Sequence, residues 1–232
     1  MSAPDSLDVV DAIFSTRSIR RLKPDPVPDW IIWDVLDAAI RAPNSGNAQR
    51  WGWVVVQDPA TKDLIGRWYL DAWNSLGSGR RARVKQWVRG LVPGRASGSD
   101  EAEPPTDRNL AAGEHLAHNL AKAPVWIFAV LQGIDGDPTV VDGADIFPAV
   151  QNLLLAARKH DLGATLTMLH RQRDREVAAV LGLPSDARAL ALIPLGYPES
   201  ATFATPQRRP VETVTYWERW GDVRPRARRP AP

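Results

Sequence analysis

Two short stretches of the sequence hold side chains suited to binding a charged, polar small molecule. The first, TRSIRRLKPDPVP (16–28), sets Arg17 and Arg20 on either side of Ser18. Guanidinium forks, a hydroxyl and free backbone N–H groups together suit a phosphate. A solvated basic loop would have the same composition, because runs of charge usually face water. This stretch alone therefore leaves both interpretations open.

The second stretch, APNSGNAQRW (42–51), crowds neutral polar side chains around Gly46. They are Asn44, Ser45, Asn47 and Gln49, and they follow Pro43. Such residues tolerate positive φ, expose backbone amides and present neutral donors and acceptors. They suit a polar heterocycle with alternating N–H and C=O groups. An ordinary helix-to-strand turn needs only one or two of them, so the crowding favours a binding loop.

Other kinds of site have weaker support. The chain has no cysteine, which removes disulfides, thiolate nucleophiles and thiolate metal ligands. His115 and His118 are three residues apart, but no third ligand stands at metal-site spacing, so we expect no metal. The GSGRRA stretch (77–82) follows a helical pattern and not a strand, so it lacks the context of a dinucleotide fingerprint. His170 stays open as a substrate-side candidate.

The distribution of charge argues against nucleic acid as a partner. The formal net charge is +2, but Arg224, Arg226, Arg228 and Arg229 lie together in the tail RPRARRP; without them, 25 basic residues stand against 27 acidic ones. Nucleic-acid binding normally needs a basic face with many phosphate contacts. No run of about 18 apolar residues and no secretory pattern is visible, so we expect a cytoplasmic protein that does not bind a membrane.

The periodicity of apolar residues predicts the elements that position these stretches. Helices are expected over 7–15, 30–41, 60–75, 108–121, 145–160 and 174–181, and strands over 53–57, 124–132, 164–169 and 189–198. Their uneven order predicts an α+β fold with a central sheet. One domain over 1–223 is expected, with a lid-like excursion at 77–107, rich in Gly, Pro, Arg and Ser, and a basic, disordered tail at 224–232. Gly163 is expected at a helix exit.

Several stretches in this order resemble the nitroreductase family of FMN-dependent oxidoreductases. The matching segments are TRSIRRLKPDPVP (16–28), APNSGNAQRW (42–51), FPAVQNLLLAARKHDLGATLT (147–167), VLGLP (180–184), ALIPLGYP (191–198) and RRPVETV (208–214). They cover most of the chain outside 77–107 and the basic tail. TMLH (167–170) and VTYWERW (214–220) resemble an actinobacterial subgroup. The resemblance implies an α+β nitroreductase-like fold with a mainly antiparallel sheet flanked by helices.

The resemblance also implies an intertwined homodimer with two FMN sites, each built from both chains. Its C-terminal extension would wrap the partner, which gives the tryptophans near 217–220 an interface role. Arg17, Ser18 and Arg208 match residues that hold the FMN phosphate, and Arg209 could substitute for Arg208. Arg20 matches a cation near the ribityl and pyrimidine end.

The remaining roles implied by the resemblance concern the flavin ring and the substrate. Pro43, Asn44, Ser45, Asn47 and Gln49 match the loop that reaches the isoalloxazine from the other subunit. Leu166 and Thr167 sit where backbone amides approach the flavin near N5. Trp87, Leu169 and His170 are the substrate-side candidates. The chain departs from the family pattern at Thr16, where many relatives have Arg, and at Arg50, where Pro is common; the mid-chain Asn and Lys of some members are not identifiable.

The function implied is transfer of a hydride from NAD(P)H through flavin N5 to an organic acceptor of nitroaromatic, quinone or enone type, by a ping-pong mechanism. No protein side chain is expected to be catalytic, because the flavin carries the chemistry. Two alternatives stay open. One is another reaction on the same scaffold, reductive dehalogenation or flavin fragmentation. The other is a non-catalytic protein that binds flavin, or a polyanion through its basic tail.

Overall fold

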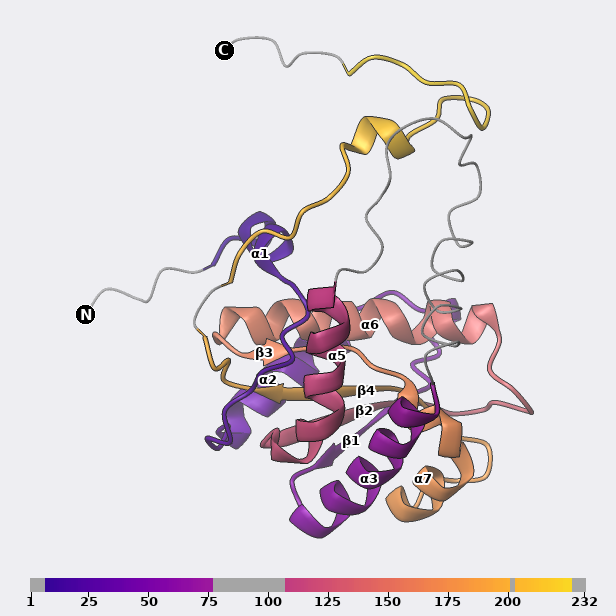
Figure 1. Ribbon diagram of the computed structural model, residues 1–232. Helices are drawn as coiled ribbons and strands as arrows, with labels where there is room; N and C mark the ends of the chain where they lie inside the picture. Colours follow the sequence, from indigo (N-terminus) through magenta and orange to yellow (C-terminus); the bar gives the residue numbers. More distant parts are fainter. Residues whose placement is uncertain (1–6, 77–106, 201–202, 227–232) are drawn as a thin grey trace.

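The structure is a computed structural model that describes residues 7–76, 107–200 and 203–226, and its centre is a four-stranded sheet (Figure 1). The strands are β1 (Trp51–Val56), β2 (Val125–Leu131), β3 (Gly163–Ala164) and β4 (Arg188–Gly196), and they lie in the order β1-β2-β4-β3. Every neighbouring pair is antiparallel. The expected α+β class with a mainly antiparallel sheet is confirmed.

Helices cover both faces of this sheet (Figure 1). One face packs against α2 (Asp29–Ala39) and α6 (Val140–Lys159), and the other packs against α3 (Pro59–Ser75), α5 (Asp107–Asn119) and α7 (Asp174–Leu181). α1 (Val9–Ser15) precedes them. Single 3-10 turns are η1 (Ser45–Asn47), η2 (Leu120–Lys122), η3 (Leu169–Arg173) and η4 (Val211–Val214).

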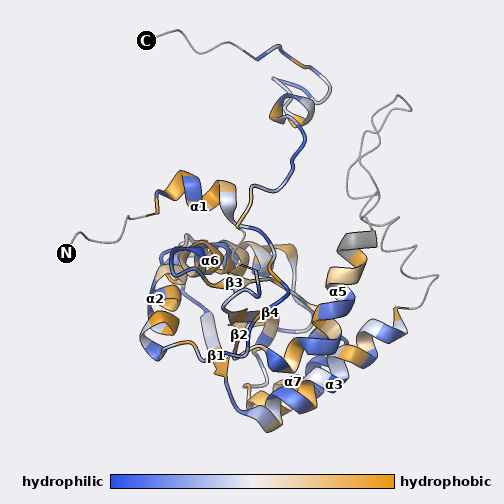
Figure 2. Ribbon diagram, turned by 60° about the vertical axis from the view of Figure 1, so that its left-hand side comes forward, coloured by the Kyte–Doolittle hydropathy of each residue, from blue (hydrophilic) through white to orange (hydrophobic). Residues whose placement is uncertain are grey.

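The central strand β2 is buried along its whole length because it feeds two hydrophobic cores. Successive side chains of a strand point to opposite faces of the sheet. Ile127 and Ala129 therefore join the core under α2 and α6, whereas Trp126 and Phe128 join the core under α3 and α5. An apolar run without polar alternation is the pattern of a strand covered on both faces. Apolar residues accordingly line the inward faces of the surrounding helices (Figure 2).

Helix α6 begins at Val140, five residues earlier than expected. The reason is a capping box: the Thr139 hydroxyl and the Asp142 carboxylate each bond to the other's backbone N–H, which starts the helix directly after the GIDGDP turn. Within the described residues α6 is long and apolar enough to cross a membrane. Its fully buried Val150 and Leu153 pack in the core beneath α2, so it is a core helix.

The exit from α6 differs from the expectation. The left-handed residue after the helix is Asp161, with φ 55°, and not Gly163. Gly163 lies in β3 instead, where a Cβ would approach Ile19 Cγ2 to 2.6 Å and Leu22 Cδ2 to 2.9 Å. The glycine is therefore required by the close packing of residues 16–22 on β3.

The strand expected over 164–169 is mostly absent. β3 ends at Ala164, and a single bridge joins Thr167 to Leu192 before the chain turns into η3. Because only this bridge pairs the segment with β4, Leu166 and Thr167 stay partly exposed at the edge of the sheet.

α1 lies against the end of α6, and the C-terminal arm (203–226) begins there and then extends away from the body of the molecule (Figure 1). Both carry exposed large apolar side chains: Val9, Val10, Ile13 and Phe14 in α1, and Trp217 and Trp220 in the arm. Arg224 lies over the Trp217 ring at 4.7 Å, and Arg226 pairs with Glu212 at 3.1 Å. The expected excursion, with Trp87, and the arginines of the tail after Arg226 lie outside the described residues.

Candidate functional site

The first polar stretch and the segment after α6 lie side by side. The Ile19 N–H donates to the Ala164 carbonyl at 2.9 Å, and Leu22 forms a bridge with Pro198. These backbone bonds set Arg17 and Ser18 beside β3, although nearly 150 residues separate the two segments in sequence.

A pocket of about 260 Å³ opens where this pair of segments meets α6 and the beginning of the C-terminal arm. Its lining consists of Ile13, Thr16, Arg17, Ser18, Gln151, Leu154, Arg158, Leu162, Ala164, Thr165, Phe203 and Arg208. The three residues expected at the phosphate, Arg17, Ser18 and Arg208, thus converge on one cavity.

The chemistry of this pocket suits a phosphate. Its lining carries three guanidinium groups and no carboxylate. The Thr165 hydroxyl is buried in it, with its residue 1% exposed, and has no hydrogen-bond partner among the described residues. A buried hydroxyl normally finds a partner, because leaving it unpaired costs about 1–3 kcal/mol. A phosphate has the acceptor oxygens and the negative charge that these groups lack, so the residues present fit such a ligand.

Arg20 lies further along the same segment, beside a buried tyrosine. The Tyr69 hydroxyl is 2.7 Å from Thr167 Oγ1, and burial raises the pKa of Tyr69. Arg20 is half-buried, within electrostatic reach of Tyr69, and burial lowers its pKa. A cation shielded from water acts more strongly on neighbouring charge than a solvated one. Arg20 therefore carries a partly shielded positive charge near Tyr69, whose hydroxyl meets Thr167.

The two backbone donors expected near the flavin are not equivalent. The Thr167 N–H already donates to the Leu192 carbonyl at 2.9 Å. The Leu166 N–H has no such bond within the described part of the chain. Of the two, Leu166 is the one whose N–H can serve a ligand.

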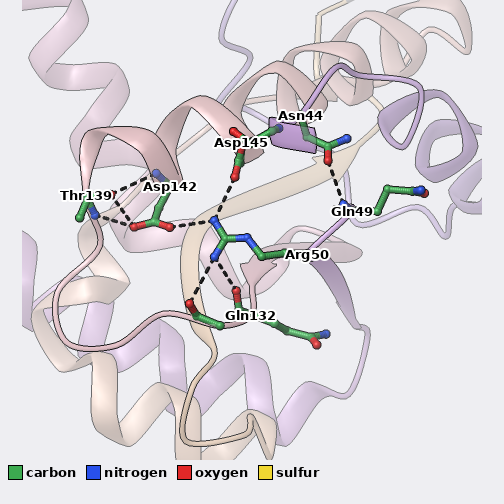
Figure 3. A network of polar contacts seen from close by, with 9 residues as sticks. Asn44, Gln49, Arg50, Gln132, Thr139, Asp142 and Asp145 are labelled. Atoms are coloured by element: carbon green, nitrogen blue, oxygen red, sulfur yellow. Dashed lines mark hydrogen bonds and ion pairs between the residues drawn. The ribbon is translucent and has the colours of Figure 1, made fainter. Parts of the chain in front are cut away.

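The second polar stretch forms an exposed loop with a defined internal structure (Figure 3). Asn44 Oδ1 accepts from the Gln49 N–H at 2.8 Å, and Asp145 Oδ1 accepts from the Ser45 N–H at 2.9 Å. Gly46, Asn47 and Gln49 all have φ between 50° and 58°. Asn is among the residues that tolerate this conformation, and its presence here agrees with the turn chemistry expected. Pro43, Ser45, Asn47 and Gln49 are exposed.

Arg50 fastens this loop to the body of the molecule (Figure 3). Its guanidinium donates to Asp142 Oδ1 at 3.1 Å, to Asp145 Oδ2 at 2.9 Å, and to the carbonyls of Gln132 and Gly133 at 3.2 Å each. Hydrogen bonds from Ser45 and then from Arg50 hold the pKa of Asp145 below its ordinary value, and the two carboxylates raise the pKa of Arg50. The arginine that departs from the family pattern is thus a structural anchor.

Within one chain, the loop and the pocket lie along different parts of α6. Asp145, which holds the loop, precedes the pocket residues Gln151, Leu154 and Arg158 on the same helix. At about 1.5 Å a residue, Gln151 is about 9 Å and Arg158 about 20 Å from Asp145 along the axis. The structure therefore brings Arg17, Ser18 and Arg208 together in the pocket, sets Leu166 and Thr167 directly after its Thr165, and leaves the loop residues towards the other end of α6.

The expectation that His170 faces a substrate does not agree with its position. His170 is 2% exposed, its Nε2 is 2.9 Å from the Ala189 carbonyl, and its ring meets Phe128 edge-on at 5.4 Å. Burial lowers the pKa of His170 to about 4. It is a neutral core residue of this chain, and Leu169 beside it packs on the same core. The third substrate-side candidate, Trp87, lies outside the described residues.

Sequence reasoning missed three residues of this region: Thr165, Arg158 and Tyr69. Thr165 could have been predicted, because it is a polar residue next to Leu166 in the strand-like run at 164–169. Arg158 and Tyr69 lie in ordinary helical patterns, and only the packing of α6 and α3 brings them here. Among the described residues, no three side chains of metal-ligating type form a cluster.

Fold and pocket together define an α+β protein with a cationic pocket whose residues suit a phosphate-bearing ligand. The profile of the nitroreductase family matches residues 13–197. The chain belongs to the nitroreductase family, and it is an oxidoreductase. Family members use flavin and NAD(P)H and are typically homodimers.

Individual relatives agree with this membership. The chain is 32% identical over 211 residues to an NADH dehydrogenase of Thermus thermophilus, covering 91% of this chain and 96% of that one. It is 26% identical over 215 residues to iodotyrosine deiodinase 1 of Rattus norvegicus, covering 90% and 69%. The fold matches an FMN- and NADPH-dependent nitroreductase, NfnB, of Sphigopyxis sp. strain HMH with a TM-score of 0.65 at 20% identity, covering 92% and 100%.

Proposed function

We propose that this chain is an FMN-dependent oxidoreductase that passes a hydride from NAD(P)H to an organic acceptor of nitroaromatic, quinone or enone type. The observation that carries the proposal is the pocket that Arg17, Ser18 and Arg208 line together with Thr165, whose hydroxyl has no partner among the described residues. Membership of a flavin-using family supports FMN as the phosphate-bearing ligand. A cytoplasmic location, where NAD(P)H is produced, is part of the same proposal.

The chain's own residues bind and orient in this scheme. Arg17, Ser18 and Arg208 hold the phosphate, and the free Leu166 N–H donates to the ring edge. When bound, FMN supplies hydride transfer at N5. Arg20, shielded beside Tyr69, stabilises negative charge at the pyrimidine end. NAD(P)H and the acceptor occupy the same face in turn, which is a ping-pong scheme.

The proposal includes a homodimer in which the loop at 42–49 completes the partner's site. Two observations support it: the loop is fixed to Asp145, about 20 Å along α6 from the pocket cation Arg158 of its own chain, and α1 and the arm expose Phe14 and Trp220, 61% and 71% exposed. Sedimentation velocity should give the mass of two chains, and removal of residues 203–232 should lower it to one. A monomer that keeps full FMN occupancy would contradict the two-chain site.

The experiment that tests the cofactor is purification followed by spectroscopy. The protein should carry flavin absorbance that bleaches on addition of NADH or NADPH. Arg208→Ala should weaken FMN binding by about 1.5–3 kcal/mol, the value of a charge-assisted hydrogen bond. Arg21→Ala is the matched control, because Arg21 is 58% exposed and its ion pair with Glu199 is long, at 3.9 Å. Equal retention of FMN in both variants would overturn the assignment.

A second candidate function is reductive dehalogenation, which the similarity to iodotyrosine deiodinases favours. The same bound flavin would serve both reactions, so the acceptor decides between them. Release of iodide from an iodinated phenol by the reduced protein, at a rate exceeding reduction of a matched nitrophenol, would select this candidate. The reverse order of rates would select the first proposal.

A further inference from the structure

The pocket is lined by a third cation, Arg158, that the sequence analysis did not single out. Arg158, in the last turn of α6, lines it together with Arg17 and Arg208. Gln151 and Leu154 line it as well, and the spacing of these three α6 residues is that of one helix face. The position of Arg158 therefore follows from how α6 packs.

Three contacts hold the Arg158 guanidinium in place. Its Nε donates to Ser15 Oγ at 3.2 Å, its Nη1 donates to Asp161 Oδ1 at 2.9 Å, and its Cζ lies 3.9 Å from the centre of the Phe203 ring. The side chain is 17% exposed. Its Nη2 has no hydrogen bond within the described residues. The arginine is thus oriented in advance, with donor capacity left for a ligand.

The residues that line the pocket carry a net positive charge, which favours an anionic ligand. Arg17, Arg158 and Arg208 contribute three positive charges. Asp161, which is outside the lining and 79% exposed, pairs with Arg158 and offsets one of these charges only in part, because an exposed ion pair is weak. A phosphate monoester carries close to two negative charges and three acceptor oxygens. The positive charge of the pocket and the unpaired Thr165 hydroxyl therefore match a phosphate monoester better than they match a carboxylate.

The Thr16 hydroxyl donates to the Ala12 carbonyl at 2.6 Å and so closes α1, and it brings no charge to the pocket. We propose that Arg158 binds the phosphate of FMN in this chain, as a third cation beside Arg17 and Arg208. This inference rests on the proposed function. Phe203 acts through Arg158 as a positioning residue.

The test compares binding of FMN with binding of riboflavin, which lacks the phosphate. Dissociation constants are measured by quenching of flavin fluorescence on the full-length protein after removal of bound flavin. Arg158→Gln should weaken FMN binding about 10- to 100-fold, the range for a lost charge-assisted bond. Riboflavin binding should change less than about twofold, and Arg158→Lys should recover most of the FMN affinity.

Arg173 offers a matched control. It also pairs with an acid three residues ahead, Glu176 at 3.5 Å, and lies over an aromatic ring, that of Trp68 at 5.7 Å, but it is not in the pocket. Arg173→Gln should leave both dissociation constants unchanged.

The outcomes separate the two proposals. A parallel loss of FMN and riboflavin binding in Arg158→Gln would mean a structural role only and would overturn this inference. Unchanged FMN binding in Arg158→Gln, together with a loss in Arg208→Ala, would overturn it while leaving the proposed function standing. A wild-type protein that binds neither flavin would overturn both.

Discussion

Replacement of Arg50 by methionine should destabilise the fold, because Arg50 neutralises a shielded carboxylate. Asp145 is 6% exposed in its side chain and has two partners, the Ser45 N–H and Arg50. Arg50→Met removes one partner and leaves the charge in place, whereas Asp142 keeps its bonds to Thr139.

The expected loss of unfolding free energy follows from how deeply the Arg50–Asp145 ion pair is buried. Breaking a fully buried ion pair by removing one partner costs about 3–5 kcal/mol. Arg50 is itself 30% exposed, so water reaches the network and the lower part of the range for a charged hydrogen bond applies. We expect Arg50→Met to lower the free energy of unfolding by about 2 kcal/mol.

The assay is urea unfolding at fixed protein and flavin concentration, because both flavin binding and dimerisation shift apparent stability. A double-mutant cycle with Asp145→Asn isolates the pair, and we expect a coupling energy of about 1 kcal/mol or more. Because the folded-state pKa of Asp145 is lowered, its stabilisation is present above the ordinary carboxyl pKa of 3.8 and is lost as pH falls further. The difference between wild type and Arg50→Met should therefore shrink at low pH. A loss below about 0.5 kcal/mol with no coupling would refute the reasoning.

Three further predictions concern the core and the loop. Because the folded-state pKa of His170 is about 4, the unfolded chain takes up its proton first, and stability should fall as pH drops from about 6.5 towards 4, by roughly 2 kcal/mol at pH 5. His170→Gln should flatten this dependence in urea unfolding at pH 7 and pH 5, and His118→Gln, at an exposed position, should not. Trp126→Ala should cost about 3–5 kcal/mol, because the ring is fully buried and its Nε1 donates to the Leu120 carbonyl at 3.0 Å; an unfolding midpoint like that of the wild type would contradict the burial. Arg50→Met should weaken FMN and riboflavin binding by the same factor, since the loop that it anchors is expected at the ring and not at the phosphate; a selective loss of FMN in the quenching titration would place the loop elsewhere.

Local features of the chain were readable because they depend on neighbours in sequence. The apolar run at 124–132 predicts a strand, and β2 forms there and is buried throughout. The apolar stripe at 30–41 predicts α2, whose Ile32, Val35 and Leu36 are buried. The polar stretch at 42–51 predicts a loop with left-handed residues, which Asn47 and Gln49 confirm. Each of these depends on backbone preference or on a repeat of two or 3.6 residues.

Errors came where a segment's environment decides its state. The run at 164–169 has the composition of a strand, but after Ala164 it meets β4 only through the bridge from Thr167 to Leu192. His170 stayed open as a substrate-side candidate in a predicted loop. The turn of η3 instead carries it beneath the sheet, against Phe128.

The sequence by itself determined which residue types are available for chemistry: two polar stretches, a late arginine and no thiol. Tertiary structure alone decided how they are grouped. The Ile19–Ala164 hydrogen bond and the packing of Gly163 set Arg17 beside Thr165, and the face that α6 turns outward adds Arg158. It also placed the 42–49 loop at the opposite end of α6. The physical reason is that conformational preference acts over a few residues, whereas contacts between distant segments depend on how the whole core packs.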